Sequence, residues 1–121
     1  MGRADLEPAW REALLLVRDG LARGDAASIG AGATLSATTH ARITESPHLG
    51  AVLGVGRSLG AVGVCAAHSG TVLGLLFAGE ETAHRRLVEV RRALPALEQG
   101  YTHRIIGGGV AVRDVDRWGK V

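Results

Sequence analysis

Aromatic residues are scarce in this chain: two Trp, one Tyr and one Phe make up 3% of its 121 residues. A core must therefore be built from Leu, Val, Ile and Ala, and there is no aromatic platform on which the bases of a single-stranded nucleic acid could stack. A strong charge of one sign is also lacking, since 14 Lys and Arg stand against 12 Asp and Glu, a formal net charge of +2. This balance favours a solvated surface of interleaved charges over a nucleic-acid-binding one.

Cysteine occurs once, as Cys65, so no disulfide can form within the chain and a reducing, cytoplasmic setting is expected. Cys65 lies in the apolar run 61–67, which predicts a buried, inert thiol rather than a nucleophile. Long apolar runs are lacking as well, because Gly, Ser or His interrupts each of them, and residues 1–5 show no apolar stretch of a signal peptide. We therefore expect neither a membrane span nor a signal peptide.

The chain does contain 46% hydrophobic residues and 18 glycines. This is enough for one core with close backbone approaches. We expect a single domain over residues 1–121, with an ordered core at about 5–113 and a polar tail at 114–121.

The first predicted helix begins at a cap on Asp5 or Glu7, with Pro8 in its first turn, and ends at Gly20 and Gly24. Its predicted apolar face consists of Leu6, Trp10, Leu14, Val17 and Leu21.

The second predicted helix runs from a cap at Asp25 to about Ile43, and its Gly30 and Gly32 suggest close packing against another helix. Its predicted face consists of Ile29, Ala33, His40 and Ile43. The third begins at Ser46–Pro47 and ends at Gly60. Its apolar positions are Leu49, Val52, Leu53 and Leu59.

The pattern then changes to short apolar runs at 61–67 and 71–77, which predict two strands of a hairpin with both faces substantially covered. A fourth helix opens after Gly79 with Glu80 and Glu81 at its positive end, and Pro95 should end or kink it. Its stripe, the clearest in the chain, consists of Ala83, Leu87, Val90, Leu94 and Leu97. A last strand is predicted at 101–106, followed by a bend at Gly107–Gly109.

The predicted order is therefore α-α-α-β-β-α-β. Helices packed on one face of a small antiparallel sheet make an α+β domain.

The strongest candidate site is the turn between the two strands of the hairpin, at His68, Ser69, Gly70 and Thr71. Backbone N–H groups and hydroxyls in such a turn can bind a phosphate or a carboxylate, and the imidazole of His68 can exchange a proton near neutral pH. The alternative is a purely structural turn, because Ser and Gly favour turns for local reasons.

The other motifs give weaker indications of a functional site. The five histidines form no HxH or HxxxH pair, so no metal site is predicted. Residues 30–36 are not a phosphate loop, since no Lys follows and no strand precedes. Gly107–Gly109 opens no helix and is no dinucleotide fingerprint, and the arginines at 85, 86, 91 and 92 indicate a solvated helix face.

The stretch 48–77, and above all the run Ala-His-Ser-Gly-Thr-Val at 67–72, resembles the C-terminal domain of GHMP-superfamily small-molecule kinases. Among these it is most similar to the L-threonine kinases of cobalamin synthesis. Segments 23–25, 33–37 and 107–110 fall where that family has similar segments, so the resemblance spans about 14–113. It implies a ferredoxin-like fold. It also implies that Ser69-Gly70-Thr71 matches the glycine-rich motif that lies beside the nucleotide phosphates and the substrate.

The family's N-terminal half carries a phosphate loop of the type Pro-x-x-x-Gly-Leu-x-Ser-Ser and the catalytic acid. This chain begins with Met and contains neither, and phosphoryl transfer depends on such groups to position phosphates and Mg²⁺. We therefore expect the C-terminal half of a split kinase, with a separate N-terminal half as partner. ATP and Mg²⁺ would bind only to the assembled kinase, and no cofactor to this chain alone.

Two other functions stay open. The chain could be a stand-alone dimeric biosynthetic enzyme acting on an amino-acid-like or peptide substrate, with His68 as acid or base, or it could be a non-catalytic binding module. In each case exposed sheet edges favour a homodimer or heterodimer.

Overall fold

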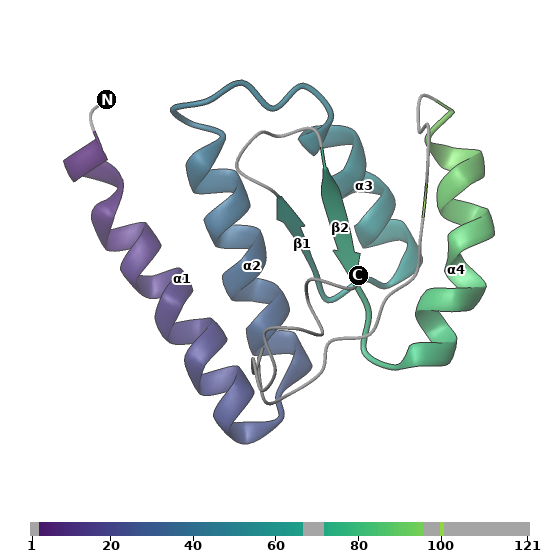
Figure 1. The fold of residues 1–121 in the computed structure, drawn as a ribbon, viewed down its shortest axis with the longest axis horizontal. Helices are drawn as coiled ribbons and strands as arrows, with labels where there is room; N and C mark the ends of the chain where they lie inside the picture. The colour runs from purple at the N-terminus through teal and green to yellow at the C-terminus, as the bar shows by residue number, and fades with distance from the viewer. Residues whose placement is uncertain (1–2, 67–71, 96–99, 101–121) are drawn as a thin grey trace, which may run out of the picture.

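The computed structural model describes residues 3–66, 72–95 and 100. These residues form four helices and a two-stranded antiparallel sheet, which confirms an α+β domain. Figure 1 shows α1 and α4 at opposite ends, with α2, the hairpin and α3 between them. The elements are α1 (Arg3–Arg23), α2 (Ala26–His40), α3 (Leu49–Leu59), β1 (Gly63–Ala66), β2 (Leu73–Leu76) and α4 (Glu80–Ala93).

Helices α1 and α2 form an antiparallel pair joined by a tight connection. Asp25 caps α2 as predicted, because its carboxylate accepts a hydrogen bond from the Ser28 backbone N–H at 3.3 Å. The Ser28 hydroxyl donates to the Leu16 carbonyl oxygen at 2.8 Å and so ties α2 to α1. The helices touch at glycines: a methyl group on Gly32 would lie 2.7 Å from the Ala13 carbonyl oxygen.

The predicted apolar face of α1 is only partly correct. Leu6 is fully buried, but Leu14 and Leu21 are 67% and 61% exposed. The line of contact with α2 runs through Ala13 and Gly20 instead. Small residues let the two backbones approach, whereas the leucines beside that line remain outside it.

Helix α2 is the centre of the described molecule, because it packs against α1 on one side and β1 on the other. Gly30 and Gly63 lie so close that a side chain on either would overlap backbone atoms of the opposite segment. The backbone N–H of Val64 donates to the Thr34 hydroxyl at 3.0 Å, so a side chain of α2 occupies this edge of β1. The helix ends at His40, before the predicted Ile43, because residues 41–43 tighten into a turn with bonds from Arg42 N–H to Thr39 and Ile43 N–H to His40.

Helix α3 begins at Leu49, three residues after the predicted cap. Ser46 and Pro47 belong to a preceding turn in which the Leu49 N–H donates to the Ser46 carbonyl oxygen at 3.2 Å. Its end at Gly60 is as predicted, since Gly60 has a φ of 79°, in the left-handed region where glycine has no Cβ penalty.

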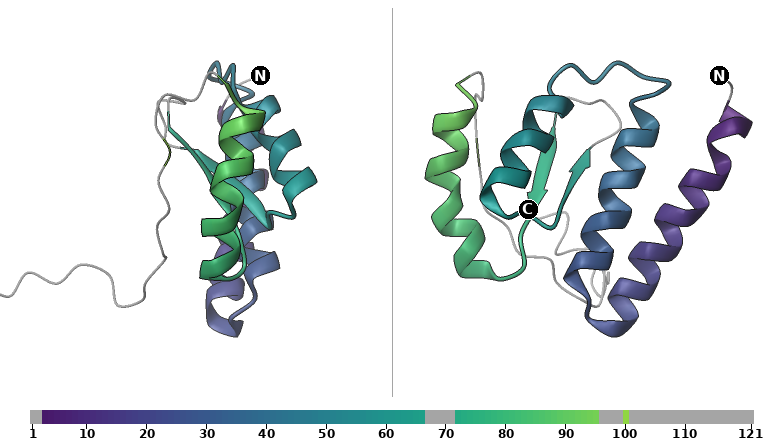
Figure 2. Two further views of the ribbon diagram at one scale, coloured as in Figure 1. Left: turned by 90° about the vertical axis from the view of Figure 1, so that its right-hand side faces the viewer. Right: turned by 180° about the vertical axis from the view of Figure 1, so that it is seen from behind.

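The hairpin lies where the sequence predicts it, with Val64 opposite Leu75 and Ala66 opposite Leu73. These four residues face α3, which lies across one face of the hairpin (Figure 2), and join Ala37, Leu49 and Val52 in the core. The other face is less covered. Cys65 is exposed there, which corrects the prediction of a buried thiol and of two covered faces. Its partner across the ladder is Gly74, whose missing side chain leaves the Cys65 sulfur open.

Helix α4 ends at Ala93, just before Leu94 and Pro95, as predicted. The described part of its stripe, up to Leu94, is only half-buried, and the neighbouring Val88 is 56% exposed. No helix in the described ranges is long and apolar enough to span a membrane. The predicted turn at 68–71, the last strand at 101–106, the Gly107–Gly109 bend and the tail at 114–121 lie outside the described residues.

Candidate functional site

The structure fixes both ends of the predicted binding turn. Strand β1 ends at Ala66, paired with Leu73 at the start of β2, so segment 67–71 connects two adjacent strand ends. Val72, directly after that segment, is 65% exposed. His68, Ser69, Gly70 and Thr71 themselves lie outside the described residues, and their role stays a prediction.

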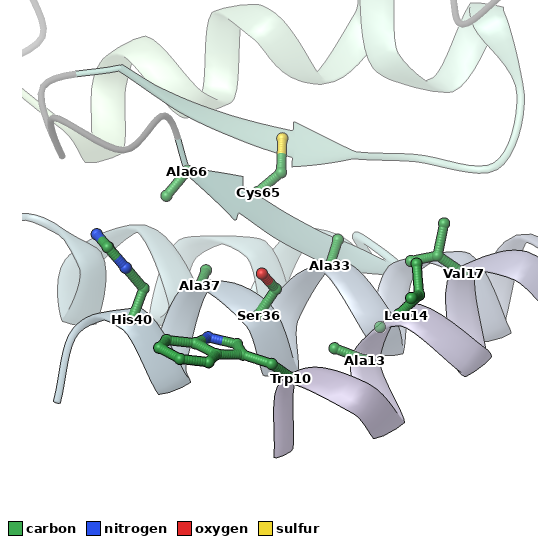
Figure 3. A pocket seen from close by; sticks show the side chains of 11 residues that line it. Trp10, Ala13, Leu14, Val17, Ala33, Ser36, Ala37, His40, Cys65 and Ala66 are labelled. Carbon is green, nitrogen blue, oxygen red and sulfur yellow. The ribbon is translucent and has the colours of Figure 1, made fainter. Parts of the chain in front are cut away.

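A hollow of about 670 Å³ lies beside the strand that leads into this turn. It is bounded by α1, α2 and the end of β1, and Figure 3 shows the side chains that line it. Ala66, directly before segment 67–71, is one of its lining residues. The hollow therefore adjoins the end of β1 from which the chain continues into segment 67–71.

The hollow exists because the wall that α2 contributes is made of small residues. Gly32, Ala33 and Ala37 leave space that larger side chains would fill. On the α1 side the wall consists of larger apolar side chains, those of Trp10, Leu14 and Val17. An open cleft with one apolar wall suits a small molecule that has an apolar part.

Two side chains of α2 give the hollow polar chemistry. Ser36 and His40 are four residues apart, so both lie on the same side of the helix and offer a hydroxyl and an imidazole. Cys65 of β1 also lines the hollow, but its thiol points away from α1 and α2, toward Gly74 of β2. Among the described residues that line the hollow there is no carboxylate and no Lys or Arg. These residues alone therefore lack the cationic groups that bind a nucleoside triphosphate and the carboxylates that commonly hold Mg²⁺.

The sequence does not predict this hollow. Its patterns place Trp10 and Leu14 on the apolar face of a helix, His40 on a helix face and Cys65 in the core. The i, i+4 spacing of Ser36 and His40 was the only signal available, and such spacing is common on any helix. In the described part of the chain, no group of three or more His, Cys, Asp or Glu side chains could hold a metal ion.

Comparison with known proteins places the chain in a family. The model of the GHMP kinases C terminal matches residues 17–96. This range holds the second part of α1, α2, α3, both strands, α4 and the predicted turn, and it amounts to well over half of the chain. No curated protein and no solved structure matches. On the evidence of that match, the chain belongs to the GHMP kinase C-terminal family.

Proposed function

We propose that this chain is the substrate-side, C-terminal half of a GHMP-type kinase that transfers phosphate from ATP to a small hydroxy amino acid or alcohol. The observation that carries the proposal is the family match over residues 17–96, which includes the hairpin and the segment between its strands. The kinase would work in the cytoplasm and would be completed by a GHMP N-terminal half on a separate chain.

The hollow beside the hairpin supports a small substrate. Its apolar wall on α1 and its hydroxyl and imidazole on α2 suit a molecule with a short carbon skeleton and polar substituents. The run Ala-His-Ser-Gly-Thr-Val at 67–72 narrows the proposal to L-threonine as the first substrate to test, because it resembles the L-threonine kinases of cobalamin synthesis.

Because the described lining of the hollow holds no Lys, Arg or carboxylate, we assign nucleotide binding mainly to the N-terminal half. In this arrangement, a phosphate or carboxylate group binds at the interface of the two halves, to Ser69, Gly70 and Thr71. His68 serves there as a proton donor or acceptor.

Phosphate transfer from labelled ATP to L-threonine tests this proposal. The assay compares this chain alone, the N-terminal half of an L-threonine kinase alone, and the two mixed. Transfer only in the mixture is the expected result. Transfer by this chain alone would overturn the split arrangement in favour of a stand-alone enzyme. A stable complex that transfers phosphate to neither L-threonine nor other small hydroxy compounds would favour a binding module.

The turn is tested by Ser69→Ala combined with Thr71→Val. We expect the double variant to fold and to lose more than about tenfold in activity, since about 1.4 kcal/mol is the scale of one or two lost hydrogen bonds to a charged group. Ser58→Ala is the matched control, because Ser58 is exposed and its hydroxyl donates to the Val55 carbonyl oxygen within its own helix, α3. Full activity in the folded double variant would show that the turn is structural.

A further inference from the structure

One end of the hollow between α1, α2 and β1 coincides with the ends of α2 and β1. These two elements run in the same direction (Figure 1), and the bond from the Val64 N–H to the Thr34 hydroxyl sets their relative level. Ala66 follows Val64 by two residues, or about 6.6 Å of strand, which corresponds to about four residues of helix. Ala66 is therefore level with the last turn of α2, which ends at His40.

The polar side chains of the hollow lie toward this end, and the opposite end is apolar. His40 is at the end itself, and Ser36 lies one turn before it. Val17 of α1 lies at the other end, where a methyl group on Gly32 would be 2.7 Å from its side chain. Figure 3 shows His40 and Ala66 at one end of the hollow and Val17 at the other. The hollow therefore suits a small molecule whose polar group lies beside His40 and whose carbon chain extends toward Val17.

The imidazole of His40 is free to bind such a polar group. The residue is half-buried, and in the described part of the chain no hydrogen bond holds its ring. A neutral imidazole has one nitrogen that accepts a hydrogen bond and one that donates, so it can bind an alcohol O–H. The described lining contains no carboxylate to pair with an ammonium group and no Lys or Arg to pair with an anion. A hydroxyl is therefore the ligand group that this end of the hollow suits best.

The same end of the hollow is where the chain enters segment 67–71, to which the proposed function assigns a phosphate. Ala66 is the last residue of β1 and lines the hollow directly before this segment. A hydroxyl that accepts a phosphate has to lie at this end rather than beside Val17. We infer that His40 binds the substrate hydroxyl that accepts the phosphate, and that the substrate's carbon chain extends along the hollow toward Val17. The inference rests on the proposed function and makes His40 a specificity-determining residue of its substrate site.

Two amino acids that differ in a single hydroxyl test the inference: L-threonine carries the hydroxyl, and L-2-aminobutyrate has a hydrogen in its place. NMR titrations of the whole chain, followed at the backbone amides of α2, measure both dissociation constants, which should be roughly millimolar for so small a ligand in an open cleft. We expect L-threonine to bind about three- to tenfold more tightly, the effect of one hydrogen bond. In His40→Ala the two amino acids should bind about equally, because the group that recognises the hydroxyl is absent.

His48→Ala is the matched control, because His48 is exposed at the start of α3 and does not line the hollow. This variant should keep the preference for L-threonine, and circular dichroism verifies that both variants keep their helices. The inference is wrong if neither amino acid binds at about 50 mM, if the unchanged chain shows no preference, or if His40→Ala keeps it. Phosphate transfer to L-threonine by the mixed halves without this preference refutes the inference alone. The preference without any transfer counts against the proposed function alone.

Discussion

Helix α4 carries the clearest apolar stripe in the sequence, whereas α2 carries two glycines and a face of small residues, yet α2 is the more deeply buried of the two. Gly30, Gly32, Ala37 and Thr39 of α2 are buried. In the α4 stripe the described residues Ala83, Leu87, Val90 and Leu94 are only half-buried. A stripe shows which side of a helix is apolar, but the size of its side chains decides how closely a neighbouring backbone can approach.

The two helices also differ in how they are attached. Helix α2 is fixed by backbone contact at Gly30 and Gly63, by the Thr34 hydroxyl and by a capping Asp25. Helix α4 has Gly79 at its start and no side-chain cap, and Leu94, just past its end, packs against the core. Substitutions in α2 should therefore cost far more stability than substitutions in α4.

The largest effect is expected from Gly30→Ala. The added methyl group would overlap the carbonyl oxygen of Val62, so α2 and β1 would have to move apart. We expect the free energy of unfolding to fall by about 3 kcal/mol, at the upper end of overpacking effects. Urea unfolding followed by circular dichroism measures the loss.

The control for Gly30 is Gly50→Ala on α3. Gly50 is exposed, and nothing lies within 4 Å of the position that its Cβ would take. The same substitution should here raise the unfolding free energy by about 0.5–1 kcal/mol, because alanine favours the helix over the unfolded chain. Equal effects of the two substitutions would contradict a close α2–β1 contact.

Local features of the fold could be predicted from the sequence. Asp25 as a cap, Gly60 as a helix end and the two strands of the hairpin each depend on a few neighbouring residues. Features that depend on which element packs against a residue could not be predicted. Leu14 was assigned to the core because its spacing is helical, but spacing does not say whether another element covers that face. Cys65 was predicted buried because its run is apolar, but Gly74 across the ladder leaves its sulfur open.

The candidate site likewise has one part that the sequence predicts and one part that it does not. Ser69, Gly70 and Thr71 are adjacent in sequence, so a turn that joins them could be proposed from the sequence alone. Trp10, His40 and Cys65 come from three separate elements, and only the packing of α1, α2 and β1 brings them around one hollow. Their grouping could not be predicted because it depends on helix positions that small residues determine.

A medium effect is expected from Thr34→Val, which keeps the shape of the side chain but removes the acceptor of the Val64 N–H. Val64 is only 2% exposed, so water cannot replace the lost bond. The loss should be about 1–3 kcal/mol, the cost of a buried donor without a partner. Thr34→Ser, which keeps the hydroxyl, should retain most of the stability.

Thr38→Val is the matched control, one turn further along α2. The Thr38 hydroxyl bonds only to the Thr34 and Leu35 carbonyl oxygens of its own helix. Its removal leaves no backbone N–H without an acceptor, so a change below about 0.5 kcal/mol is expected. If Thr34→Val costs no more than Thr38→Val, the bond between α2 and β1 contributes nothing to stability.

The smallest effect is expected on α4, from Arg86→Gln. The Arg86 guanidinium donates to both carboxylate oxygens of Glu89 at 2.9 Å, but the two side chains are 40% and 45% exposed, so water and salt screen the pair. Its removal should lower the unfolding free energy by less than about 0.5 kcal/mol, and by even less in 0.5 M salt, roughly as for other exposed ion pairs. Arg85→Gln, on an exposed neighbour, gives the baseline.

Hydrogen exchange compares α4 with α2 directly: amides of α4 should exchange faster than those of α2, since a half-buried helix opens without disturbing the core. A loss above about 2 kcal/mol, or slower exchange in α4 than in α2, would mean that α4 is held as firmly as α2.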